Sequence, residues 1–177
     1  MSIEPLIELL PEYARDLGQN LKHLAEETCL SDQRKWGTFL ASACATGEPR
    51  VTKAAAEAAT AGGLSEEASR AARAAAAIMG MNNVYYRTIH LLENREYQTL
   101  PAKLRMNIIA NPGVDKTDFE LWCLAVSAIN ACAACLDAHE EELKKRAVPA
   151  IQVQASLRIA AVIVATARVL GSEGAPA

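Results

Sequence analysis

Short apolar side chains, alanine above all, recur at helical spacing along most of this 177-residue sequence. The segment 65–81, for example, contains an alanine run, Ala74 to Ala77, followed by Ile78 and Met79. Alanine has the highest helix propensity, whereas aromatic residues, which favour strands, make up only 5% of the chain. We therefore predict an all-α fold in which small side chains let helices pack closely.

Turn signals divide this pattern into separate helices. Asn111-Pro112-Gly113 is a strong turn, and Thr117 with Glu120 at the third following position fits a capping box at the start of a helix. The predicted helices cover residues 3–29 (interrupted at Pro11), 36–46, 51–60, 65–81, 117–129, a segment from the cysteines near 132 to Lys145, and 151–170.

The length and the 51% hydrophobic content suit one domain, residues 1–177, with an ordinary core. A faint internal similarity suggests two duplicated helical halves, 1–100 and 101–177. Trp36 and Trp122 each open a helix of small residues, and the apolar run after Arg73 resembles the run after Arg158 at an offset of 85. Only the second half contains paired cysteines.

Charge and hydropathy exclude several classes of function. The formal net charge is −3 and no basic run is present, so we expect no nucleic-acid partner. The N-terminus does not read as a secretory signal, and the most apolar stretch, Ile159 to Ala167, is far shorter than the roughly 20 residues that span a bilayer. We expect a cytoplasmic protein without a membrane segment, in which a Cys-x-x-Cys pair is redox-active or metal-binding rather than structural.

The chemical motif of the chain is Glu120-x11-Cys132-x2-Cys135-x3-His139. Residues three and four apart share one face of a helix, so both cysteines and the histidine are predicted to lie along one stripe. If the preceding helix reverses near Asn130, Glu120 lies about 15 Å before the turn and His139 about 13 Å after it, and the two come level. An unbroken helix would hold Glu120 about 18 Å from Cys132.

In the hairpin arrangement, Glu120 orients His139, and His139 accepts the proton of Cys135. A cysteine thiolate of the pair attacks a peroxide oxygen to give a sulfenic acid, and the other cysteine resolves it to a disulfide that an external dithiol reduces. Position alone does not decide which cysteine attacks. No bound metal is expected, although the four residues have the ligand types of a zinc site.

Other interpretations of single residues remain open. Glu120 is also explained as a capping glutamate, and His139 as a surface helix residue. Three further cysteines, Cys29, Cys44 and Cys123, are interpreted as small buried hydrophobes, and His23 and His90 as surface residues.

Three blocks of the sequence resemble the alkylhydroperoxidase D (AhpD) family, within the carboxymuconolactone decarboxylase-like proteins. They are residues 77–87 (AIMGMNNVYYR), 104–113 (LRMNIIANPG) and the segment from Phe119-Glu120-Leu121-Trp122 through His139. The resemblance implies an all-helical, homotrimeric antioxidant enzyme that reduces organic hydroperoxides and regenerates an AhpC-type peroxiredoxin. It implies no bound cofactor: electrons come from the dihydrolipoyl group of a lipoyl-bearing acyltransferase, and before that from NADH through lipoamide dehydrogenase.

Carried over by position, the resemblance makes Cys135 the sulfenic-acid cysteine, Cys132 the proton donor and resolving thiol, and Glu120 and His139 the proton relay. The chain departs from some family members at Ala134, where they carry a histidine between the cysteines. Two alternatives remain: a thiol-disulfide adaptor for a peroxiredoxin with little direct peroxidase activity, and a decarboxylase-like helical enzyme without redox chemistry, which leaves the cysteine pair without a function.

Overall fold

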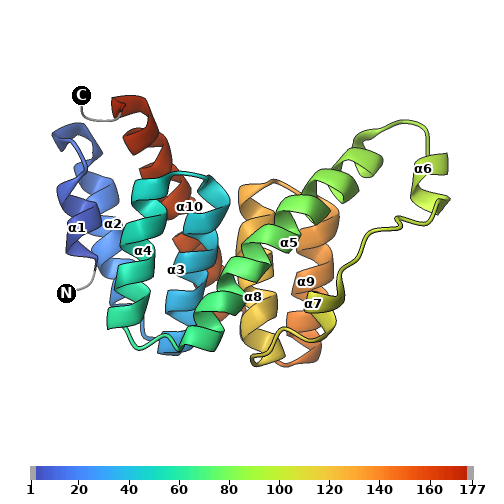
Figure 1. Cartoon of the computed structure of the whole chain (residues 1–177), viewed down its shortest axis with the longest axis horizontal. Helices are drawn as coiled ribbons and strands as arrows, with labels where there is room; N and C mark the ends of the chain where they lie inside the picture. Colours follow the sequence, from blue (N-terminus) through green and yellow to red (C-terminus); the bar gives the residue numbers. More distant parts are fainter. Residues whose placement is uncertain (1–2, 175–177) are drawn as a thin grey trace.

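The computed structural model describes residues 3–174, and all regular structure within them is helical (Figure 1). No strand occurs in this range, which confirms the all-α prediction. The helices are α1 (Glu4–Glu8), the 3-10 helix η1 (Glu12–Ala14), α2 (Arg15–Ala25), α3 (Asp32–Thr46), α4 (Pro49–Ala61), α5 (Glu66–Leu91), α6 (Glu96–Thr99), α7 (Asn107–Ala110), α8 (Lys116–Ile129), α9 (Ala133–Lys145) and α10 (Ala150–Glu173).

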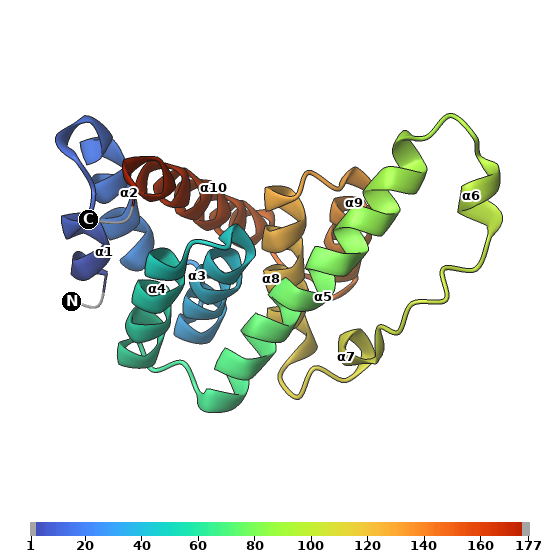
Figure 2. The ribbon, with the colours of Figure 1, turned by 45° about the horizontal axis from the view of Figure 1, so that its top comes forward.

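The centre of the fold is the contact between α3 and α8. Both helices are buried over most of their length, because each is covered by α5 and by α10 (Figure 2). Phe39 of α3 and Phe119 and Trp122 of α8 have no exposed surface. The indole Nε1 of Trp122 donates to the carbonyl oxygen of Arg34, 3.2 Å away, so this ring is buried with its polar atom paired.

Helix order and length repeat along the chain. The helices α3, α4 and α5 have 15, 13 and 26 residues, and α8, α9 and α10 have 14, 13 and 24. The contacts between the two sets repeat as well. The second helix of each set contacts the third helix of the other set: α9 contacts α5, and α4 contacts α10. The boundary near residue 100 remains a prediction, because the segment 92–115, which includes α6 and α7, lies between the two sets of helices.

Helix α5 continues ten residues beyond Met81, through Asn82 and Asn83 to Leu91, where the sequence left open a continuation or a kink. Both asparagines are buried and packed within the helix rather than ending it. Beyond them, the last turns of α5 and the segment carrying α6 project away from the helical body in both views (Figures 1 and 2). Residues 91–100 are all exposed.

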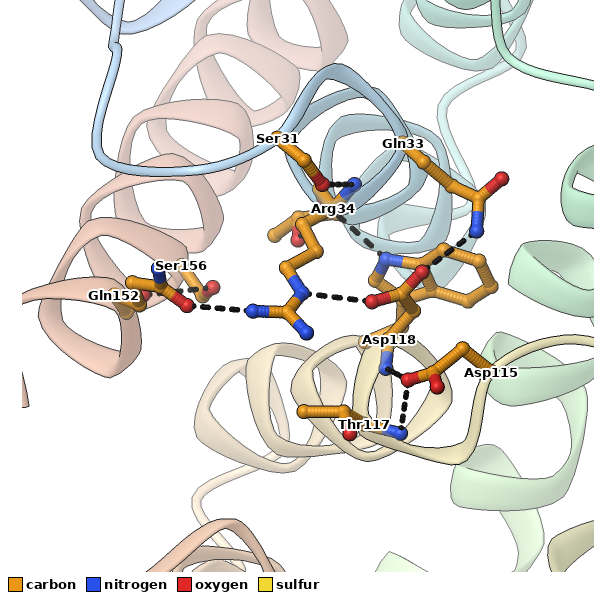
Figure 3. A network of polar contacts seen from close by, with 10 residues as sticks. Ser31, Gln33, Arg34, Asp115, Thr117, Asp118, Gln152 and Ser156 are labelled. Carbon is orange, nitrogen blue, oxygen red and sulfur yellow. Dashed lines mark hydrogen bonds and ion pairs between the residues drawn. The ribbon is translucent and has the colours of Figure 1, made fainter. Parts of the chain in front are cut away.

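A partly buried polar network holds the start of α8 against α3 and α10 (Figure 3). Arg34 of α3 donates to Asp118 of α8 at 2.7 Å and to Gln152 of α10 at 2.8 Å, and Gln33 also donates to Asp118. Asp118 is 5% exposed, and both of its oxygens are paired. The network therefore places the first turn of α8, and with it Glu120 at the start of the next turn, relative to two other helices.

The capping-box prediction at Thr117 was wrong. The N-cap of α8 is Asp115, whose carboxylate accepts from the backbone N–H of Thr117 at 2.8 Å and of Asp118 at 3.3 Å. Desolvation raises the pKa of Asp115, but the hydrogen bonds from Thr117 and Asp118 outweigh it, and the net pKa lies below its ordinary value. Because Asp115 caps the helix, the Glu120 side chain is not needed there and points elsewhere.

Helix α10 is longer than the apolar stretch recognised in the sequence. An 18-residue window of this 24-residue helix has a mean hydropathy of 1.6, which makes α10 the one helix within residues 3–174 that is long and apolar enough to cross a membrane. However, Ile159, Ile163 and Leu170 are buried against the body of the protein, where α10 contacts α2, α3 and α8. This is the arrangement of a core helix.

Substitution of Gly37 by alanine is expected to lower the free energy of unfolding by about 3 kcal/mol, because a Cβ atom at this position overlaps the indole ring of Trp122. Gly80→Ala is the matched control, since Gly80 lies in α5 with no atom within 4 Å of an added Cβ, and alanine there stabilises the helix by about 0.5–1 kcal/mol. Thermal unfolding of both variants measures the difference. Equal melting temperatures would show that α3 and α8 do not approach as closely as described.

Candidate functional site

The chain reverses between α8 and α9, as the hairpin hypothesis requires. Helix α8 ends at Ile129, Ala131 adopts a left-handed conformation with φ of 52°, and Cys132 is the N-cap of α9. Two crossed hydrogen bonds close the turn: Ala131 N–H donates to the Ala128 oxygen and Cys132 N–H to the Ser127 oxygen, both at 3.1 Å. This is the Schellman pattern, in which a glycine usually occupies the position of Ala131.

A network of side chains from α5 supports the turn. Asn83 donates to the Ser127 hydroxyl at 3.0 Å and accepts from the Asn130 side chain at 3.0 Å, and Arg87 donates to the Asn130 carbonyl oxygen. Asn83 is fully buried, and both ends of its amide are thus paired. Helix α5 therefore determines where the chain reverses and where the cysteines lie.

The two cysteines of the motif form a disulfide, with 5.3 Å between their Cα atoms. Cys132 is fully buried and Cys135 is 7% exposed. Cys135 occupies the first turn of α9, where the backbone N–H groups and the helix dipole favour a negatively charged sulfur once the disulfide is reduced. Of the two sulfurs, that of Cys135 is the more accessible to a reactant.

Glu120 and His139 lie against each other, as the hairpin predicts. The Glu120 Oε2 and His139 Nδ1 atoms are 2.6 Å apart, and the two residues are 2% and 8% exposed. The Lys116 Nζ atom lies 4.0 Å from the other carboxylate oxygen. Because a carboxylate only accepts, ionised Glu120 places the proton of a neutral His139 on Nδ1 and leaves the lone pair on Nε2, which faces the sulfur of Met79 at 3.2 Å.

Cys135 and His139 open onto a mostly apolar cavity of about 350 Å³. The residues that line it come from α5, α7 and α9. They are Met79, Asn82, Tyr86 and His90 of α5, Ile109 of α7, and Ala134, Cys135, Ala138 and His139 of α9. The cavity thus joins the predicted nucleophile and base to a volume suited to a small apolar ligand.

Sequence reasoning missed the contribution of α5 to this cavity, and it assigned His90 to the surface. Met79, Asn82, Tyr86 and His90 are spaced three, four and four residues apart, which places them on one face of a helix. That spacing could have been recognised in the sequence. It places the four side chains on one helix face beside α9 only if α5 is known to continue past Met81. His90 is exposed, as predicted, yet it also lines the cavity.

The three remaining cysteines do not line this cavity. Cys123 is fully buried, as predicted, while Cys29 and Cys44 are half-buried. Burial raises the pKa of the Cys44 thiol and raises that of Cys123 well above its ordinary value, which disfavours their reactive thiolates. Within residues 3–174, no group of three or more histidine, cysteine, aspartate or glutamate side chains is arranged to hold a metal ion.

Comparison with known proteins adds a family to this geometry. A sequence model of the carboxymuconolactone decarboxylase family matches residues 95–175. The chain is 64% identical to the alkyl hydroperoxide reductase AhpD of Maricaulis maris over 98% of its own length and 99% of that protein. It is 59% identical to the protein of the same name from Hyphomonas neptunium (99% and 97% of the two chains) and 54% identical to that of Caulobacter vibrioides (99% and 96%). The chain therefore belongs to the AhpD family, within the carboxymuconolactone decarboxylase-like superfamily.

Proposed function

We propose that this protein is a thiol-dependent reductase of organic hydroperoxides that works through the Cys132/Cys135 pair. The observation that carries the proposal is the position of the Cys135 sulfur, which is bonded to Cys132 and opens onto an apolar cavity beside the Glu120–His139 pair. The names of relatives more than half identical along nearly the whole chain support the same activity.

In the reduced protein, His139 takes the proton of Cys135, and Glu120 stabilises the imidazolium that results. The thiolate bonds to the terminal oxygen of the hydroperoxide, the O–O bond breaks, and the alkoxide takes a proton to leave as an alcohol. Cys135 is then a sulfenic acid. The Cys132 thiol attacks its sulfur, water leaves, and the disulfide forms.

Return to the dithiol needs two electrons, which we assign to a protein-bound dihydrolipoyl group as the external reductant. Support comes from the shape of the site, because a slender, apolar dithiol suits a cavity whose lining is mostly apolar. Ala134 adds only a methyl group to the cavity wall, so access to Cys135 is not narrowed there. The reduced pair in turn regenerates an AhpC-type peroxiredoxin in the cytoplasm.

The test is mass spectrometry of the reduced protein after one equivalent of cumene hydroperoxide. We expect the peptide that contains Cys132 and Cys135 to lose two hydrogen masses and to regain them with dihydrolipoamide. An unchanged peptide would contradict the proposal. Slow oxidation by the peroxide together with fast reduction of an oxidised peroxiredoxin would instead establish the adaptor function.

We also propose that the protein acts as a homotrimer. The projecting segment formed by the end of α5 and by residues 92–106 carries apolar side chains that the helical body does not cover: Val84, Leu91 and Leu100 are 58%, 77% and 52% exposed. Association of copies through this segment would remove that surface from water. Light scattering is expected to give three times the mass of one chain, and a monomer at all concentrations would refute the assembly.

A further inference from the structure

Asn82 lines the cavity, and its amide oxygen is unpaired. The residue is 5% exposed, and its Oδ1 atom is fully buried with no hydrogen-bond partner within residues 3–174. The next residue shows the usual arrangement, since both ends of the Asn83 amide are paired. A buried amide oxygen without a donor costs about 1–3 kcal/mol, so its presence in the wall of a cavity indicates a ligand that donates a hydrogen bond.

The position of Asn82 along α5 shows which part of a ligand it meets. Met79, one turn earlier, is in contact with His139 Nε2, and it is 1% exposed. Tyr86 and His90 lie about 6 Å and 12 Å beyond Asn82 along the helix axis, and exposure increases in that direction. Asn82 therefore lies at the inner end of the cavity, near the reacting groups, and His90 lies at the mouth.

On the basis of the proposed function, we propose that the Asn82 carboxamide binds the –OOH group of the hydroperoxide. Its Oδ1 accepts from the peroxide O–H, while Nδ2 is a donor for the oxygen that becomes the alkoxide. The thiolate of Cys135 bonds to the terminal oxygen, which keeps its hydrogen, and the alkoxide leaves with the proton returned by His139. The apolar substituent extends toward Tyr86 and His90, so the substrate class is small hydroperoxides with apolar substituents.

The same geometry argues against the reductant as the partner of Asn82. A lipoyl arm carries its amide several carbon atoms away from the sulfurs. With the sulfurs at Cys135, this amide reaches the level of Tyr86 or His90 rather than Asn82. The hydroperoxide, by contrast, has its only hydrogen-bond donor on the oxygen that reacts.

Asn82→Leu tests the assignment, because leucine fills a similar volume without polar atoms. We expect the second-order rate constant for oxidation of the reduced protein by cumene hydroperoxide to fall about 10- to 100-fold. Each factor of ten corresponds to about 1.36 kcal/mol of activation free energy. Reduction of the disulfide by dihydrolipoamide should change less than about twofold. The melting temperature should not fall, since an unpaired buried amide is replaced by an apolar group. Thr60→Leu is the control, because Thr60 is exposed on α4 and does not line the cavity.

Each other outcome has a defined meaning. An unchanged peroxide rate constant would overturn the assignment. If only the reduction by dihydrolipoamide became slower, the lipoyl amide would be the partner of Asn82 and the assignment would be wrong. If both steps slowed equally and the melting temperature fell, Asn82 would have a structural function and the assignment would also be wrong. A wild-type protein whose thiols react with cumene hydroperoxide no faster than free dithiothreitol would reject the proposed function itself.

Discussion

Cys135→Ser is expected to lower hydroperoxide turnover with dihydrolipoamide by about 1,000-fold or more. A serine hydroxyl keeps the volume of the side chain, but it is a far weaker nucleophile at neutral pH and cannot form the disulfide. The sulfur of Cys135 opens onto the cavity beside His139, whereas Cys132 is fully buried. The loss therefore concerns the chemical step and not access to the site. Steady-state consumption of cumene hydroperoxide measures it.

Two further serine variants locate the effect. Cys132→Ser keeps the attacking sulfur and removes the resolving one, so it should react once with peroxide and accumulate a sulfenic acid that a dimedone probe labels. Cys44→Ser is the matched control with unchanged turnover, because burial raises the pKa of that half-buried thiol and its sulfur accepts from Arg73, which does not act as a base. Equal turnover in wild type and in Cys135→Ser would refute the assignment of the nucleophile.

Glu120→Gln should have the second largest effect, a loss of about 100-fold or more in the rate of peroxide reduction. The carboxylate lies 2.6 Å from His139 Nδ1 and can only accept, so it holds the ring proton there and stabilises the imidazolium. A glutamine can turn its NH₂ group toward Nδ1. His139 Nε2 then carries the proton and is no longer a base toward Cys135.

The control for Glu120→Gln is Glu141→Gln on α9. Glu141 is exposed and forms a surface ion pair with Lys145, so its loss should change turnover less than twofold. Rates of the peroxide step for both variants, with circular dichroism to verify the helical content, test the relay. If Glu120→Gln were folded and fully active, Glu120 would have no function beyond its place in the helix.

Much of the candidate site followed from local sequence because its parts are near one another along the chain. The spacing from Cys132 to His139 is short enough for helix geometry to place these residues on one stripe. The reversal near Asn130 then brings Glu120 to His139, at 19 residues' separation. The prediction of this hairpin was correct even though Ala131, rather than a glycine, adopts the left-handed conformation in its turn.

Predictions were incomplete or wrong where a local signal competed with tertiary packing. At Asn82 and Asn83 the sequence left open whether the helix continues or kinks, because asparagine is a weak helix former. In the structure, Asn83 is paired with Ser127 and Asn130 of another segment, and these contacts stabilise α5 beyond the point that propensity predicts. Thr117 is likewise a good capping residue, but Asp115 caps α8 in its place.

By itself, the sequence determined the helical class, the helix hairpin and the pairing of Glu120 with His139, because helix periodicity and a single turn are properties of a few neighbouring residues. Only the tertiary structure decided that α5 forms the second wall of the cavity and that Asn82 lines it. Those relations join residues about 50 positions apart, and they depend on how α3, α5, α8 and α10 cross, which is set by the fit of side chains from the whole core.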